Sequence, residues 1–423
     1  MKTLMAATLV LLVGGSLSLD LGFRSAAGQP AALSADASAP DHVPDSSAGE
    51  QPESAETSDR LASLRVMAAD DGGLLDRMIG QMIMVGFVGD DERDRGIAAV
   101  RDQLAQGVLG GVVLYPENIG KPRKLRNLTA FLANANSELV PLIAVDQEGG
   151  QVQRLTRRDG YMYFPSARDV ASRPKLTAKD GALHLYEVMG RELAHAGINV
   201  NFGPVVDLNV NPKNPVIGRR KRSFGSDPKA VIDFARAFIV AHREANVVTA
   251  AKHFPGHGSS LTDSHKVLAD ISTGWREKEI EPYVALAHAG LLDMVMVGHL
   301  YHPRFSDGPD VPASLSARAI KALRAKGWIG FNGVVVSDDL EMGAVRRAYS
   351  LEDRVSMAIN AGTDLIVFSN VKTRDPGIGP RIHGIIADAV RDGRIPRARI
   401  EEAYGRMLLL KRRLMQHDLE GAW

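Results

Sequence analysis

From about residue 70 onward, short apolar runs rich in β-branched residues alternate with longer stretches whose apolar residues recur every three or four positions. The short runs predict buried strands, and the longer stretches predict helices that cover them. The strand candidates are residues 82–87, 111–115, 142–146, 200–208, 248–253, 294–299, 334–338 and 365–368. Eight buried strands separated by helices predict an α/β fold, a single parallel (β/α)8 barrel of the TIM type.

Helix signals support this alternation. Ser350 begins a capping-box-like start, and that helix is expected to end near Gly362. Residues 381–391 and 397–415 predict two final helices that close the barrel and pack on its flank. An open doubly wound sheet is the alternative. That fold would need a glycine-rich nucleotide-binding loop after its first strand, and we find no convincing loop of this kind in the sequence.

The N-terminal region has a different pattern. Residues 1–27 predict a signal peptide, because a short basic start precedes a small apolar core that is too short to span a bilayer comfortably. Two cleavage positions suit this segment, and a retained N-terminal anchor is the alternative. Residues 28–69 are rich in Ala, Ser, Pro and acidic residues and predict a disordered linker. We therefore expect an exported protein, periplasmic or secreted, whose catalytic domain spans residues 70–423.

Composition narrows the class of function. Lys and Arg number 51 against 50 Asp and Glu, and the resulting net charge of +1 argues against a nucleic-acid-binding surface. The absence of cysteine excludes disulfides, thiolate nucleophiles and thiolate metal sites. We expect no cofactor and no metal, a monomer, and no stable membrane insertion unless the signal segment is retained.

The polar loop after strand 248–253 carries the densest candidate chemistry. Asp263 and His265 lie two residues apart, and a carboxylate that binds one ring nitrogen can fix the tautomer of the other. The ordinary pKa of histidine, about 6.5, suits a group that both gives and takes a proton near neutral pH. Metal ligation and ordinary loop polarity remain alternatives for these histidines.

The whole run is similar to a known family. Lys-His-Phe-Pro-Gly-His-Gly at residues 252–258, followed by Asp-Ser-His at 263–265, resembles the bacterial β-N-acetylglucosaminidases of glycoside hydrolase family 3, the NagZ type. Asp-Gln-Glu-Gly-Gly at residues 146–150 and Ser-Asp-Asp-Leu-Glu-Met at 337–342 match two further landmarks of that family. The resemblance covers roughly residues 74–415.

The resemblance implies a mechanism and a set of catalytic residues. Asp338 corresponds to the catalytic nucleophile, His265 to the acid/base and Asp263 to the carboxylate that polarises it. A retaining glycosidase needs such a pair, one group to form a covalent glycosyl-enzyme and one to protonate the leaving oxygen and then activate water. Asp339 fits a structural capping role better.

The resemblance also implies sugar ligands, namely Asp146, Arg154, Arg222, Lys252 and His253. Arg154 has an alternative interpretation as a supporting salt bridge to a nearby carboxylate, and Lys252 as a counter-charge that keeps the nucleophile ionised.

Other basic and histidine residues carry weaker signals. Arg222 ends a run of four bases, residues 219–222, which departs from the family pattern, and no role is assigned to the other three. His257 is interpreted as a loop-structuring residue, and His299 is a weaker site candidate.

These features predict a retaining exo-β-N-acetylhexosaminidase that hydrolyses terminal β-GlcNAc from peptidoglycan fragments (muropeptides) or related glycans. Two alternatives share the fold: another family 3 β-glycosidase, such as a β-glucosidase, or a β-N-acetylglucosaminide phosphorylase. A metal-dependent hydrolase using His253, His257, Asp263 and His265 is an alternative of a different class. A non-catalytic wall-binding module ranks last, because nucleophile and acid/base candidates are both present.

Overall fold

A computed structural model describes residues 71–136, 138–177 and 180–420. The predicted signal peptide and linker lie outside the described residues and stay predictions. None of the helices within the described ranges is long and apolar enough to cross a membrane.

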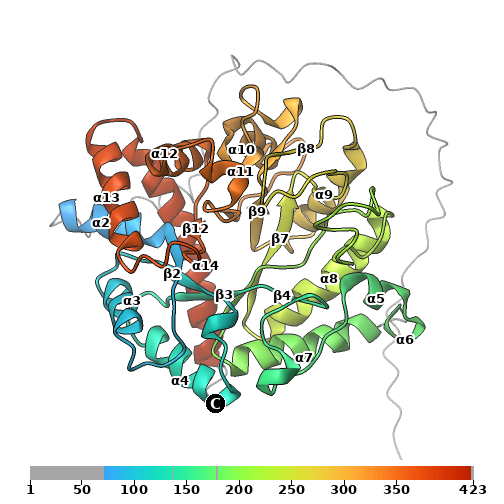
Figure 1. The fold of residues 1–423 in the computed structure, drawn as a ribbon, viewed down its shortest axis with the longest axis horizontal. Coiled ribbons are helices and arrows are strands. Elements are labelled where there is room, and N and C mark those ends of the chain that lie inside the picture. Colours follow the sequence, from blue (N-terminus) through green and yellow to red (C-terminus); the bar gives the residue numbers. More distant parts are fainter. Residues whose placement is uncertain (1–70, 137, 178–179, 421–423) are drawn as a thin grey trace, which may run out of the picture. The chain divides into compact units, whose positions relative to one another are not determined.

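Eight parallel strands form one sheet that closes on itself (Figure 1). In spatial order they are β1 (Ile83–Gly86), β2 (Gly111–Leu114), β3 (Leu142–Val145), β6 (Val200–Asn201), β7 (Val248–Phe254), β9 (Met294–Val297), β11 (Val334–Ser337) and β12 (Ile366–Phe368). β12 pairs with β1, and a parallel bridge between Val336 and Leu365 joins β11 to the start of β12. The predicted (β/α)8 barrel is confirmed.

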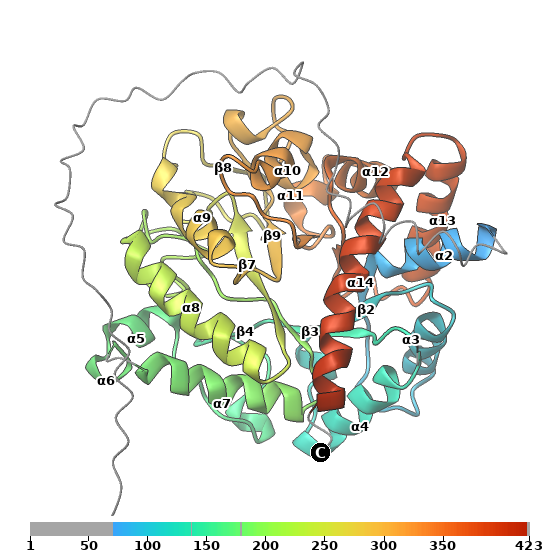
Figure 2. The ribbon, with the colours of Figure 1, turned by 180° about the vertical axis from the view of Figure 1, so that it is seen from behind.

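Helices surround the barrel, as Figures 1 and 2 show from opposite sides. The longer ones are α2 (Asp71–Gln81), α3 (Arg95–Ala105), α4 (Pro122–Ala133), α7 (Gly181–His195), α8 (Pro228–Glu244), α9 (Glu281–His288), α10 (Ala317–Arg324), α12 (Leu351–Ala361), α13 (Ile378–Arg391) and α14 (Arg397–Glu420). The short helices are α5 (Ala167–Ser172), α6 (Pro174–Thr177) and α11 (Gly343–Arg346). Two small sheets lie in the loops: an antiparallel hairpin of β4 (Gln147–Gly149) and β5 (Val152–Gln153), and a parallel pair of β8 (Ala269–Asp270) and β10 (Leu300–Tyr301).

The strand sequences explain the barrel, because successive side chains point to opposite faces. Met84 and Val113 belong to the apolar cluster inside the barrel, whereas Ile83, Val85 and Val112 belong to the larger cluster shared with the surrounding helices. Near-continuous apolar runs therefore fill both layers at once, as expected for a parallel sheet covered by helices.

Helix α14 lies across the N-terminal end of the barrel. Its Met407, Leu410 and Leu414 join the apolar cluster inside the barrel. The Lys411 Nζ donates to Gln81 Oε1 at 2.6 Å and to the Gly110 carbonyl at 2.8 Å, and these acceptors lie within two residues of the starts of β1 and β2. The segment predicted at residues 397–415 thus closes the end opposite the strand tips, whereas α13 packs on the flank against α2 and α12.

Of two local predictions, the ends of the helix that begins after Ser350 are confirmed, whereas the length of one strand is wrong. The Ser350 hydroxyl accepts from the Asp353 amide, and Gly362 adopts a left-handed conformation at the end of α12, as expected. The strand predicted at residues 200–208 is wrong in length, because β6 ends at Asn201. Pro204 follows at once and has no amide hydrogen for a strand ladder. Val205 then forms only a single bridge with Lys252.

Candidate active site

The carboxyl ends of the strands bring distant polar residues to one end of the barrel. Asp146 directly follows β3, Lys252 and His253 lie at the end of β7, and Asp338 directly follows β11. The C-terminal face of such a barrel is where its catalytic residues gather.

Lys252 is the charged centre of the half of the site that is predicted to bind sugar. Its side chain is 2% exposed, and its Nζ lies 2.7 Å from Asp146 Oδ1 and 2.7 Å from Glu148 Oε1. Burial disfavours the ammonium, but the two carboxylates raise the pKa of Lys252 above its ordinary value. The side chain is therefore a fixed positive charge whose ion-pair partners are Asp146 and Glu148. Its predicted role as a counter-charge for the nucleophile Asp338 stays a prediction.

Asp146 is held between two cations. Its Oδ2 accepts from Arg154 NH2 at 3.0 Å, while its Oδ1 contacts Lys252. Burial acts to raise the pKa of Asp146, but the charges of Lys252 and Arg154 lower it below its ordinary value. The salt-bridge alternative for Arg154 is thus realised, with Asp146 as the partner.

Arg222 forms a two-pronged ion pair with Glu148, a carboxylate for which no site role was predicted. Arg222 Nε lies 2.8 Å from Glu148 Oε2, and its NH2 lies 2.8 Å from Oε1. Both side chains are nearly inaccessible, with exposures of 9% and 6%. Burial opposes the charge on Glu148, but Arg222 and Lys252 lower the pKa of Glu148 to about 2. Arg222 thus lies beside Glu148 and His253, and its role toward substrate stays a prediction.

A second carboxylate without a predicted role, Asp207, orients His253. Its Oδ2 lies 2.7 Å from His253 Nδ1, and its Oδ1 accepts from the His253 amide at 3.1 Å. His253 Nε2 lies 3.4 Å from NH2 of Arg222, which can only donate, so Nε2 accepts and Nδ1 carries the proton. Asp207 ends the apolar run Val205–Val206, and that strand-end position was the available signal for it.

Asp338 lies at the tip of β11 and is partly exposed. Its Oδ1 accepts from the Asp339 amide at 2.9 Å. Burial by the surrounding protein acts to raise the pKa of Asp338, but the nearby histidines, His299 first, lower it below its ordinary value. The carboxylate is therefore ionised at neutral pH, as a nucleophile requires.

Asp339 and His299 support the loop that carries Asp338. Asp339 Oδ1 accepts from the amides of Glu341 and Ser369, each at 2.9 Å, and burial raises the pKa of Asp339 to about 6. His299 Nε2 donates to the Asp339 carbonyl at 2.8 Å, and its Nδ1 lies 2.6 Å from the Ser314 hydroxyl. Both ring nitrogens of His299 are thus bonded to protein groups, which indicates a structural role.

The Asp263–His265 pair forms the other half of the site. His265 Nδ1 lies 2.9 Å from Asp263 Oδ1, and the His265 amide donates to the same oxygen at 3.0 Å. Burial acts to raise the pKa of Asp263, but the hydrogen bonds from His265 lower it below its ordinary value. This pairing leaves His265 Nε2 as the nitrogen that can exchange a proton with a ligand.

The loop that carries this pair lies against the nucleophile loop. The Gly343 amide donates to the His265 carbonyl at 3.2 Å, five residues beyond Asp338. The side chain of His265 is nevertheless 61% exposed. The structure thus places all eight predicted site residues at one end of the barrel, while their roles in catalysis and binding stay predictions.

The residues of the metal-site alternative bind protein groups instead of converging. His253 pairs with Asp207, His257 with Ser264, and Asp263 with His265. Across the described ranges, no three His, Asp or Glu side chains are arranged to hold a metal ion.

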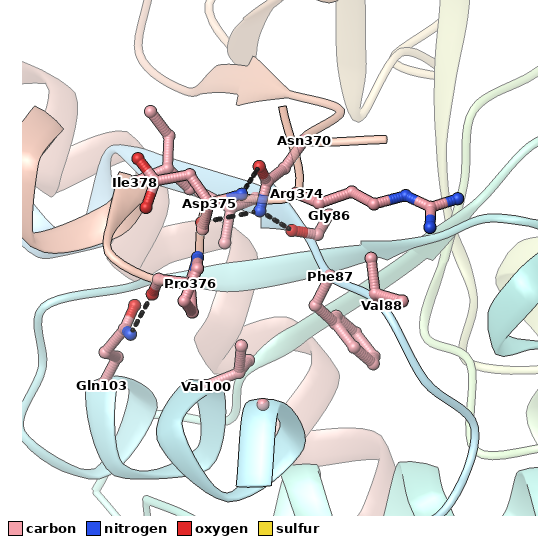
Figure 3. Close-up of a pocket in the computed structure, with 12 residues that line it drawn as sticks. Gly86, Phe87, Val88, Val100, Gln103, Asn370, Arg374, Asp375, Pro376 and Ile378 are labelled. Carbon is pink, nitrogen blue, oxygen red and sulfur yellow. Dashed lines mark hydrogen bonds between the residues drawn. The ribbon is translucent and has the colours of Figure 1, made fainter. Parts of the chain in front are cut away.

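A cavity of about 280 Å³ lies beside the site, between α3 and the loop that follows β12 (Figure 3). Phe87 and Val100 give it apolar walls. Asn370 Nδ2 donates to the Gly86 and Asp375 carbonyls at 3.2 and 2.9 Å and holds the loop in place. None of the predicted site residues lines this cavity, so it is separate from the catalytic cluster.

Comparison with known proteins finds a glycosyl hydrolase family and relatives named beta-hexosaminidase. The model of the glycosyl hydrolase family 3 N-terminal domain matches residues 74–410. Beta-hexosaminidase A of Pseudoalteromonas piscicida is 28% identical over 390 residues, which cover 84% of this chain and 64% of that protein. A beta-hexosaminidase of Xylella fastidiosa is 36% identical over 295 residues, which cover 68% of this chain and 82% of that protein.

A solved structure agrees in fold. The glycoside hydrolase family 3 beta-N-acetylglucosaminidase from Paenibacillus sp. superposes with a TM-score of 0.72 at 32% identity, covering 81% of this chain and 62% of that one. The chain therefore spans somewhat less than two thirds of the length of these two larger relatives, from Pseudoalteromonas and Paenibacillus. With the family model matched across residues 74–410, the chain belongs to glycosyl hydrolase family 3.

Proposed function

We propose that this protein is a retaining exo-β-N-acetylhexosaminidase that hydrolyses terminal β-GlcNAc. One observation carries the proposal: an ionised carboxylate, Asp338, lies at a strand tip whose following loop is hydrogen-bonded to the segment that carries the Asp263–His265 pair. A nucleophile and a proton donor on opposite sides of a glycosidic bond are what retention requires.

In the first step the Asp338 carboxylate attacks the anomeric carbon. The bond between that carbon and the leaving oxygen breaks, and the proton on His265 Nε2 passes to that oxygen. The product is a glycosyl ester of Asp338 and a free alcohol. Asp263, which accepts from Nδ1, stabilises the imidazolium that donates this proton.

In the second step water attacks the same carbon. Neutral His265 takes a proton from the water at Nε2, the ester bond breaks, and Asp338 leaves as a carboxylate. The sugar is released with its original anomeric configuration, and the enzyme returns to its starting protonation state.

Asp146, Arg154, Arg222, Lys252 and His253 are the proposed sugar ligands. Lys252, Arg154 and Arg222 each form an ion pair with Asp146 or Glu148, so no cation of the cluster lacks a charged partner. Such a preformed polar surface suits the neutral hydroxyl groups of a sugar.

The natural setting is part of the same proposal. Names of the relatives support GlcNAc-containing glycans as substrates, and peptidoglycan fragments are the proposed source. The apolar segment at the N-terminus supports export to the periplasm or the medium, and the exported protein is proposed to be a monomer. Mass spectrometry of the protein from each cell fraction tests export, since protein found only in the cytoplasmic fraction with residues 1–27 retained would contradict it.

The activity is tested with a 4-nitrophenyl β-N-acetylglucosaminide beside the matching β-glucoside, with and without EDTA. We expect cleavage of the acetamido sugar only, unaffected by EDTA and abolished in Asp338→Asn. Preference for the glucoside would favour another family 3 β-glycosidase. A rate that EDTA removes would favour the metal-dependent hydrolase, and formation of GlcNAc 1-phosphate in phosphate buffer would favour the phosphorylase.

A further inference from the structure

His257 is a buried histidine that the proposed mechanism does not use. Its side chain lies behind the sugar-binding His253, and the two rings meet edge to face with centroids 5.7 Å apart. Its amide donates to Asp207 Oδ1 at 2.7 Å, and its carbonyl accepts from Asn214 Nδ2 at 2.7 Å. The backbone at this position is therefore fixed from both sides.

The ring of His257 reaches the segment that carries the acid/base pair. His257 Nε2 lies 2.9 Å from the hydroxyl of Ser264, the residue between Asp263 and His265. Ser264 is 2% exposed, whereas Leu261 and Val267 on either side are 74% and 45% exposed. In a largely exposed loop, Ser264 is thus the side chain that turns inward, and His257 is its partner.

We propose that His257 is a positioning residue that holds the Asp263–His265 pair over the site through Ser264. This inference rests on the proposed function, because it takes His265 as the acid/base. Asp207 accepts hydrogen bonds from His253 and from the His257 amide, so a single carboxylate fixes the sugar-binding ring and the anchor of the acid/base loop. The distance from sugar to proton donor is thereby set within one connected group of side chains.

The chemistry of the anchor suits this role. Burial lowers the pKa of His257 to about 4, so the ring is neutral at working pH. A hydrogen bond between two neutral groups contributes a modest net energy, which favours one loop position without locking it. A loop that must admit substrate and release product needs a preferred position that it can still leave.

The test compares two substrates that differ only in how much they need a proton donor. A dinitrophenolate leaves without protonation, whereas the sugar alcohol released from N,N′-diacetylchitobiose needs it. We expect Ser264→Ala to lower kcat/KM for diacetylchitobiose about tenfold more than for the 2,4-dinitrophenyl β-N-acetylglucosaminide. His257→Ala should do the same, and His257→Gln should recover part of the loss, because its amide reaches the position of Nε2.

The control is Ser306→Ala, which removes a similarly buried hydroxyl that donates to the Val311 carbonyl at 2.7 Å, and it should affect both substrates equally.

The role of His257 would be overturned if Ser264→Ala affected both substrates equally while the loss in His265→Ala depended on the leaving group. That result would leave the proposed function intact. If His265→Ala itself showed no dependence on the leaving group, the acid/base assignment and this inference would both fall. Should His257→Ala fail to fold, Ser264→Ala decides the question, since it only removes an oxygen.

Discussion

Lys252, at the centre of the proposed sugar-binding half, is 2% exposed, whereas the His265 side chain in the other half of the site is 61% exposed. The first half consists of ion pairs from three segments: Asp146 and Glu148 just after β3, Arg222 in the loop between β6 and α8, and Lys252 in β7. The second is a hydrogen-bonded pair on a loop, held by Ser264 and by the Gly343 amide.

The difference follows from what each half must do. Groups that bind the sugar work best when their orientation is fixed before the substrate arrives, and low exposure makes their electrostatic interactions strong. The proton donor must instead reach a leaving group that enters and departs. We therefore expect changes in the first half to affect both folding and activity, and changes in the second to affect activity alone.

Lys252→Met should have the largest effect. It leaves two buried carboxylates without the cation between them, and removing one partner of a buried ion pair costs about 3–5 kcal/mol of unfolding free energy. Activity on the aryl glycoside should fall to background. Chemical denaturation and kinetics measure the two effects, with the exposed Lys266→Met as the control. A stable Lys252→Met protein with normal activity would contradict the claim that the buried half of the site is needed for both folding and activity.

His265→Ala should separate activity from stability. Because the side chain is exposed, the unfolding free energy should stay within about 0.5 kcal/mol of wild type. Loss of a general acid should lower kcat/KM for diacetylchitobiose by about 10²–10⁴-fold, with a much smaller loss on the dinitrophenyl glycoside. A large loss of stability would show that the loop is part of the folded core after all.

Glu148→Gln should change the pH dependence of stability. The pKa of Glu148 is lowered to about 2 from its ordinary 4.5, so its ionised form stabilises the fold above about pH 4.5, and this contribution is lost as pH falls toward 2. One such group contributes up to about 1.4 kcal/mol per pH unit in that window. Urea unfolding between pH 5 and 3 should therefore show a shallower slope in Glu148→Gln. Asp263→Asn should reduce the slope by less, because the Asp263 side chain is 23% exposed against 6% for Glu148.

Gly343→Ala should have the smallest effect. A methyl group there would lie 2.7 Å from the Lys266 carbonyl and 2.8 Å from the His265 carbonyl, so the acid/base loop must shift. We expect a loss of several-fold in kcat/KM for diacetylchitobiose. Gly384→Ala, where a methyl group meets nothing within 4 Å, is the matched control and should be neutral. Equal kinetics in the two variants would mean that the Gly343 contact does not position His265.

The alternation of short apolar runs with helix-spaced apolar residues was sufficient to predict most of the barrel, because buried parallel strands are continuous apolar runs. It failed at residues 200–208, where apolar residues continue past Asn201 although the ladder does not. It also could not place α14, since a helix that covers the end of a barrel has the same apolar spacing as one on its flank.

The motifs located the site residues but not their partners. Glu148 and Arg222 are 74 residues apart, and Asp207 and His253 are 46 apart. No local sequence pattern predicts such pairings, because these residues come together only when the chain folds into the barrel. The His257–Ser264 contact spans seven residues, yet the sequence indicated only that His257 shapes the loop.

The central claim is that Asp338 forms a covalent bond to the sugar, and trapping tests it most directly. The protein would be incubated with a 5-fluoro derivative of an activated β-N-acetylglucosaminide, which slows the second step, then digested and mapped by mass spectrometry. We predict one added sugar residue on the peptide that contains Asp338, and none in Asp338→Asn. An adduct on another residue, or turnover that releases the inverted anomer without any adduct, would contradict the claim.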